Sequence, residues 1–125
     1  SWDIAPPAIT PDSKHLLNFS PLNNSIPTGM IPFTESLKNT FERVVPFFDS
    51  EIKKNLLSKK NVLIAAHGNS LRALCKYLFK ISNSKINELE IPTGNPLVIK
   101  FDSKVDVEKY YYLDTSRAKK IIFNQ

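Results

Sequence analysis

Apolar and polar positions divide the chain into an irregular first part and a regularly patterned remainder. Prolines occur at six positions within residues 1–33, and neither a helical nor a strand period runs through this segment. Proline fixes φ and lacks a backbone N–H, so each one interrupts regular structure. We therefore expect residues 1–33 to form an irregular loop segment, and residues 34–125 to form the α/β part of a single domain.

A long helix is predicted directly after this loop segment. Thr34 or Ser36 can cap its first turn, and Glu35 would lie near the positive end of the helix dipole. The apolar positions that follow recur at helical spacing. They are Leu37, Phe41, Val44, Val45, Phe48, Ile52, Leu56 and Leu57. Pro46 lies inside this pattern and should bend the helix, which the polar residues 58–61 then end.

The stretch LIAAHGNSLRAL, residues 63–74, changes from one pattern to another within a few residues. Residues 62–66 are apolar and too few for a helix, which favours a buried strand. Beyond Ser70 the apolar positions return to helical spacing. They are Leu71, Leu74, Cys75, Leu78 and Phe79. A buried strand, a tight turn and an amphipathic helix are therefore predicted in direct succession.

The last third of the chain predicts a short helix followed by a pair of strands. Ser82 or Ser84 can cap the short helix. Strands are predicted over residues 96–101 and 109–113, and the polar segment between them favours an antiparallel pair. A weak final helix is expected over residues 116–123. Helices and strands thus alternate along the chain, which indicates the α/β class.

The charge pattern disfavours nucleic acid as a partner and suits a small anionic substrate. Lysine and arginine number 17 against 12 acidic residues, which gives a net charge of +5. Acidic residues are interspersed among the lysines, and no basic block alternates with aromatic residues. We interpret the lysines as solvated helix faces and expect no nucleic-acid partner. A mildly positive chain attracts small anions.

Neither a membrane segment nor a metal framework is predicted. No run of about 18 apolar residues occurs, and the start, Ser-Trp-Asp, has no basic segment ahead of an apolar one. The chain begins without methionine, which fits a processed chain or a piece of a longer one. The single cysteine, Cys75, is interpreted as a small buried side chain of a cytoplasmic protein. Two histidines and one cysteine without ligand spacing argue against a zinc site.

The turn after the predicted strand combines the features of an anion site. Ligands in α/β sheets collect at the carboxyl ends of strands, where His67 is expected. Gly68 leaves room for a phosphate, and the amides of residues 68–70 lie at the positive end of the next helix. Asn69 adds an amide donor. The alternative is a purely structural turn, in which Asn69 or Ser70 caps the helix and His67 is a satisfied core residue.

The same stretch resembles the segment around the second histidine of cofactor-dependent phosphoglycerate mutases, a family within the histidine phosphatase superfamily. Four further stretches resemble that family in the same order and at similar spacing. They are IPFTESL (31–37), RVVPFF (43–48), LEIPTGNPLV (89–98) and KYYYLD (109–114), the last with one extra tyrosine. The resemblance therefore covers nearly the whole chain and is specific to the mutase branch.

This resemblance implies an activity and a set of roles. The family interconverts 3-phosphoglycerate and 2-phosphoglycerate in glycolysis and gluconeogenesis, primed by 2,3-bisphosphoglycerate and without a metal. His67 matches the second histidine, which stabilises charge on the transferring phosphoryl group. Gly68 and Asn69 match the adjacent pair that contacts substrate. The expected fold is a phosphoglycerate-mutase-like three-layer sandwich of the α/β class.

The family's other catalytic groups have no counterpart here. No Arg-His-Gly-Glu motif occurs, so the nucleophilic histidine is absent, and the motif of the acid/base glutamate is absent too. His15 is expected to be a surface loop residue. The resemblance implies the carboxy-terminal half of a mutase without its N-terminal strands, inactive alone. We expect its strand at 62–66 to have an unpaired edge and exposed apolar faces, and the chain to form a homo-oligomer or pair with a missing N-terminal half.

Two alternatives to a mutase half are a non-catalytic remnant that binds phosphate or a protein, and a phosphatase of the same superfamily. The stretches PTGNPLV and TESL argue against the phosphatase. The tail departs from the family pattern, with Asp114 where glycine is usual and an atypical end, RAKKIIFNQ. Arg72 is interpreted as a surface or packing residue.

Overall fold

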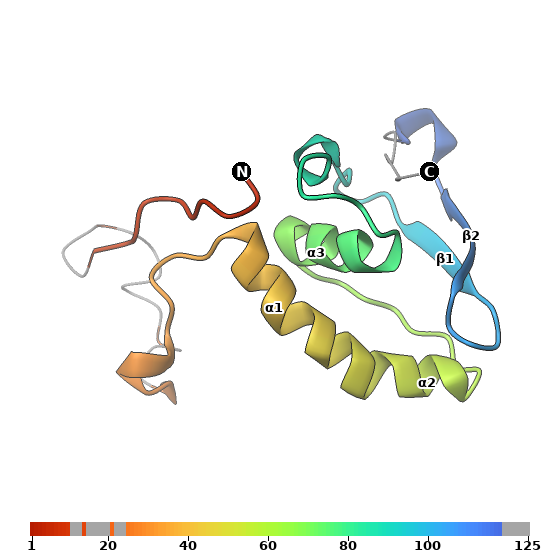
Figure 1. Ribbon diagram of the computed structural model, residues 1–125, viewed down its shortest axis with the longest axis horizontal. Helices are drawn as coiled ribbons and strands as arrows, with labels where there is room; N and C mark the ends of the chain where they lie inside the picture. Colours follow the sequence, from red (N-terminus) through yellow and green to blue (C-terminus); the bar gives the residue numbers. More distant parts are fainter. Residues whose placement is uncertain (11–13, 15–20, 22–24, 119–125) are drawn as a thin grey trace.

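The computed structural model describes residues 1–10, 14, 21 and 25–118. Within these residues three α-helices accompany a two-stranded sheet (Figure 1). They are α1 (Leu37–Phe47), α2 (Lys53–Leu57), α3 (Gly68–Leu78), β1 (Leu97–Phe101) and β2 (Val107–Tyr112). The described part of residues 1–33 has no α-helix or strand, as predicted, and its helical positions are 3-10 ones at residues 21, 25 and Thr28–Met30. No described helix is long and apolar enough to cross a membrane.

Helix α1 begins at the predicted cap. Ser36 Oγ accepts a hydrogen bond from the Asn39 backbone N–H at 3.2 Å, and Asn39 Oδ1 accepts from the Ser36 N–H at 3.1 Å. This reciprocal capping box satisfies two amides that the helix leaves free. Glu35 was expected in the first turn, but it precedes the cap and instead pairs with Arg43 in the second turn of the helix.

Pro46 interrupts the regular hydrogen bonding of the long helical run. Helix α1 ends at Phe47, a π-helical segment follows over Phe48–Ile52, and α2 completes the run. Pro46 has no N–H to give to the preceding turn, so the backbone adjusts directly after it. The axis changes course between α1 and α2, which confirms the predicted bend (Figure 1).

The core lies between α1, α3 and the loop that follows α3. Seven buried residues form the main cluster. They are Leu37, Ala73, Cys75, Phe79, Ile81, Ile86 and Leu89. Trp2, from the N-terminal loop, packs edge-on against Phe41 with 5.5 Å between ring centroids. The apolar stripes predicted for the two long helices are therefore the surfaces that hold the described chain together.

The predicted antiparallel pair is present. Leu97 lies opposite Tyr112 and Lys100 opposite Lys109, with a bulge between Lys100 and Phe101. The predicted short helix is a 3-10 turn, Ile86–Glu88, and a second 3-10 turn, Thr115–Arg117, stands where the final helix was expected. The remainder of that final helix, from residue 119 onward, falls outside the described residues.

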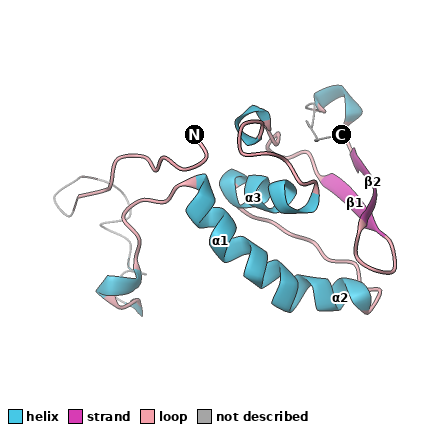
Figure 2. Cartoon of the chain, viewed as in Figure 1, coloured by secondary structure: helices cyan, strands magenta, loops and turns pink. Residues whose placement is uncertain are grey.

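Residues 62–66 do not form the predicted buried strand. Figure 2 shows this connection between α2 and α3 as loop, and its backbone makes no hydrogen bond to another described segment. Leu63 is 92% exposed, and Val62 and Ile64 are 38% and 37% exposed. A strand needs a neighbour to satisfy its backbone, and the described residues supply none here. The expected exposed apolar side chains are present, whereas the strand whose edge was expected to be unpaired does not form. The α/β class holds, while the three-layer sandwich stays a prediction.

Candidate functional site

The change from extended chain to helix takes place at His67. This residue is the N-cap of α3, with extended backbone angles (φ −62°, ψ 149°), and its carbonyl accepts from the Leu71 N–H at 3.1 Å. Its side chain makes no capping bond and is exposed. The structural alternative is therefore wrong in two respects, because His67 is not a core residue and neither Asn69 nor Ser70 is the cap.

Three backbone amides remain free at the start of α3. Among the described residues, no acceptor takes the N–H groups of Gly68, Asn69 or Ser70. The first turn of any helix leaves such donors, and the helix dipole adds positive potential there. A Cβ placed on Gly68 would meet nothing within 4 Å, so the space beside this residue is open. The arrangement suits an anion that accepts several hydrogen bonds at once.

Asn69 is connected to a part of the chain well beyond α3. Its Oδ1 accepts from Arg72 Nη1 at 3.4 Å, and Arg72 Nη2 donates to the Ile86 carbonyl at 2.8 Å. Residues three apart on a helix share a face, so the sequence does carry a signal for the first contact. It carries none for the second, which spans 14 residues. Arg72 was interpreted as a surface or packing residue, and neither its hydrogen bond to Asn69 nor that to the Ile86 carbonyl was predicted.

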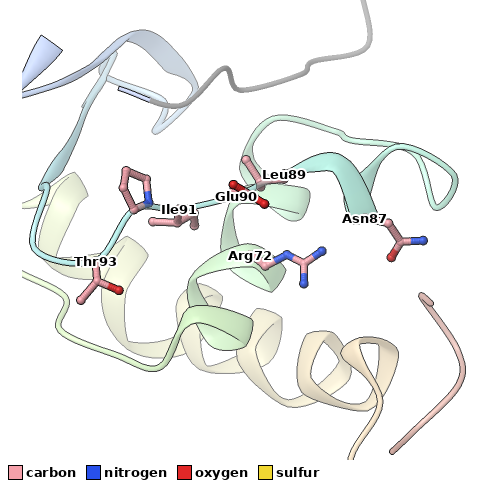
Figure 3. Close-up of a pocket in the computed structure, with 7 residues that line it drawn as sticks. Arg72, Asn87, Leu89, Glu90, Ile91 and Thr93 are labelled. Atoms are coloured by element: carbon pink, nitrogen blue, oxygen red, sulfur yellow. The ribbon is translucent and has the colours of Figure 1, made fainter. Parts of the chain in front are cut away.

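A shallow depression of about 490 Å³ lies beside Arg72 (Figure 3). Its walls come mainly from the segment after the 3-10 turn Ile86–Glu88. The lining residues are Arg72, Asn87, Leu89, Glu90, Ile91, Pro92 and Thr93. His67, Gly68 and Asn69 do not line this depression. Arg72 does line it, and it also donates a hydrogen bond to Asn69 in the turn.

Other reactive side chains do not join His67 in the described structure. Burial raises the pKa of the Cys75 thiol to about 12, which removes it as a nucleophile. The described residues include no group of three His, Cys, Asp or Glu side chains that could hold a metal ion. His15, expected on a surface loop, falls outside the described residues. The start of α3 therefore offers one imidazole, three amides and the Asn69 amide group.

Comparison with known proteins extends this picture. A sequence profile of the histidine phosphatase superfamily (branch 1) matches residues 11–112. A 2,3-bisphosphoglycerate-dependent phosphoglycerate mutase of Pelagibacter ubique is 51% identical over 123 residues, which cover 98% of this chain and 51% of the relative. Proteins with the same description from Pasteurella multocida and Haemophilus influenzae are 46% and 44% identical over 113 residues, 90% of this chain and 50% of each relative. The chain therefore spans about half the length of the curated relatives it matches.

Proposed function

Because this chain belongs to the histidine phosphatase superfamily, we propose that it supplies the second-histidine side of a phosphoglycerate mutase site. The observation that carries the proposal is the exposed His67 beside three free amides, within a segment that matches proteins described as mutases. The proposed reaction interconverts 2-phosphoglycerate and 3-phosphoglycerate, primed by 2,3-bisphosphoglycerate, without a metal ion. The proposed location is the cytoplasm.

Each group at the turn has a role in phosphoryl transfer. The amides of residues 68–70 and the Asn69 amide group donate to phosphoryl oxygens, and Gly68 leaves the space that they need. His67 stabilises the charge that develops on the transferring group. Such preorganised donors act most strongly when they face the position where negative charge develops.

We further propose that the chain alone is inactive. Covalent transfer requires a nucleophile, and the sequence has no Arg-His-Gly-Glu motif that would supply one. Residues 62–66, whose backbone pairs with no other described residue and whose Leu63 is exposed, form the segment that would pair as a strand with a second polypeptide. The proposed partner is the half of the mutase that this chain does not match, or a second copy of the chain.

The decisive experiment is a mutase assay of the chain with and without its proposed complement. We expect no turnover above background for the chain alone in the presence of 2,3-bisphosphoglycerate. Addition in trans of the unmatched half of the Pelagibacter ubique relative should restore activity. In that mixture His67→Gln should lower the rate about 10²–10³-fold, because one charge-stabilising group is lost. Lys104→Gln, an exposed change in the β1–β2 turn, serves as the control and should leave the rate unchanged.

The contrary outcomes separate the alternatives. Turnover by the chain alone would overturn the proposal of inactivity. Restored activity that His67→Gln leaves intact would overturn the role of His67. Binding of 3-phosphoglycerate without any activity in the mixture would favour the alternative of a non-catalytic phosphate-binding remnant.

A further inference from the structure

The Arg72 side chain joins the first turn of α3 to the 3-10 turn that contains Ile86. Nη1 donates to Asn69 Oδ1 at 3.4 Å, in the first turn of α3, and Nη2 donates to the Ile86 carbonyl at 2.8 Å. Ile86 is fully buried in the main cluster, so the carbonyl that accepts the second hydrogen bond belongs to a packed residue. The guanidinium is planar, so two hydrogen bonds from its nitrogens fix the orientation of the group more firmly than a single hydrogen bond would.

The contact also determines which way the Asn69 amide faces. An arginine side chain carries donors only, so the Asn69 group beside it must be the oxygen. The Asn69 nitrogen, with its two donor hydrogens, then faces away from Arg72. An amide rotated by 180° would place a donor against a donor and withdraw the N–H₂ group from the ligand.

The environment of Arg72 differs from that of a solvated surface residue. Its Nε atom is buried and has no hydrogen-bond partner among the described residues. Burial of an unpaired donor opposes folding, so it calls for an explanation beyond stability. Figure 3 shows the side chain extending from α3 toward the 3-10 turn that carries Asn87.

We propose that Arg72 is a positioning residue that holds the Asn69 amide with its donor side turned toward a bound phosphoryl group. This inference rests on the proposed function, since it concerns the same anion-binding turn. It predicts that the effect of Arg72 on ligand binding passes through Asn69 and does not arise from the arginine charge alone.

An NMR titration of the chain with 3-phosphoglycerate tests this coupling. Shifts of the backbone amides of residues 68–70 report binding, and the Asn69 side-chain N–H₂ signals report its orientation. Arg72→Met replaces the guanidinium with an unbranched side chain that carries no hydrogen-bond donor. It should weaken the apparent affinity for 3-phosphoglycerate about 3–10-fold, as expected for one lost hydrogen bond. It should also shift and mobilise the Asn69 N–H₂ signals before any ligand is added.

Lys76→Met is the matched control. Lys76 lies one turn further along α3 and likewise donates to a loop carbonyl, that of Ile81, at 2.5 Å. Lys76→Met therefore removes one positive charge and one hydrogen bond to a loop, and neither involves Asn69. The affinity should therefore change less than about 2-fold, within the range expected of a site with no shared partner.

A double-mutant cycle completes the test. In an Asn69→Ala background, Arg72→Met should change the affinity less than about 2-fold, because the group that it positions is gone. Equal weakening in both backgrounds would overturn the proposal and assign the effect to charge. Absence of any shift at residues 68–70 in the unsubstituted chain would overturn the proposed phosphate turn and this inference with it. If Arg72→Met does not fold, Arg72→Lys takes its place in the same cycle, since one ammonium group cannot bridge both acceptors in the same plane.

Discussion

His67 and Cys75 lie on the same helical segment and have opposite surroundings. His67 is exposed at the N-cap of α3, next to three amides that donate to no described residue. Cys75 is 4% exposed and packs in the main cluster with Leu37 and Phe79. Burial in an apolar environment disfavours the thiolate, which is the nucleophilic form, so the Cys75 thiol is unreactive. At the residue scale, the exposed polar groups of α3 lie at its start, and its thiol lies in the core.

Cys75 should therefore resist alkylation in the folded chain. Its pKa is raised from 9.0 to about 12 by burial, which lowers the thiolate fraction at pH 8 by about 10³-fold. We expect iodoacetamide labelling, followed by mass spectrometry, to be slower than in urea-unfolded chain by at least about 10²-fold. Since the unfolded thiol ionises first, stability should also fall as pH rises from 9.0 toward about 12. Equal labelling rates in both states would contradict the burial of Cys75.

Local interactions decide where the helices begin and where they change course. Helix α1 starts at the Ser36–Asn39 capping box, and its regular bonding ends just after Pro46. Helix α3 starts at His67 without any side-chain cap. The difference follows from function as proposed, because a capping side chain at the start of α3 would occupy the amides that an anion needs.

The cap of α1 gives a prediction at this scale. Ser36→Ala should lower the free energy of unfolding by about 1 kcal/mol, because the Asn39 amide loses its acceptor. Ser50→Ala is a suitable control, since this exposed serine makes only a 3.5 Å contact with the Phe47 carbonyl. Its effect should stay within about 0.5 kcal/mol. Urea unfolding followed by circular dichroism measures both, and equal effects would argue against the capping box.

At the scale of the whole molecule, several large apolar side chains among the described residues are exposed. Leu63 is 92% exposed, and Phe47, Leu57 and Leu113 are each more than half exposed. The chain also spans only about half the length of its relatives. Exposed apolar side chains beside an unpaired backbone favour association with another chain.

We expect the chain alone to be marginally stable or to associate. A circular-dichroism melt should show low cooperativity, or sedimentation should show species larger than a monomer whose share grows with concentration. A cooperative and stable monomer would refute this expectation. Leu63→Lys should reduce association with the complementary half and leave the melt of the chain alone unchanged. Ser103→Lys, at an exposed polar position in the β1–β2 turn, controls for the added charge and should not affect association.

Near-neighbour patterns were enough to predict much of this fold. The cap at Ser36, the bend after Pro46, the helix after His67 and the antiparallel strand pair all depend on residues close in sequence. Their energetics arise within a few turns or across one short connection, which is why the sequence carries them. The turn at residues 67–69 was found for the same reason.

Other features were decided by contacts between distant segments. The apolar run at residues 62–66 predicts a strand, but only a neighbouring strand can make it one, and none is present among the described residues. The link from Arg72 to Ile86 joins α3 to a loop 14 residues away and has no periodic signal. By itself the sequence thus determined the start of α1, the bend after Pro46, the strand pair and the place of residues 67–69 at the start of a helix. The tertiary structure decided which apolar faces are covered and which side chains hold Asn69, because burial and hydrogen-bond geometry depend on partners that local spacing does not specify.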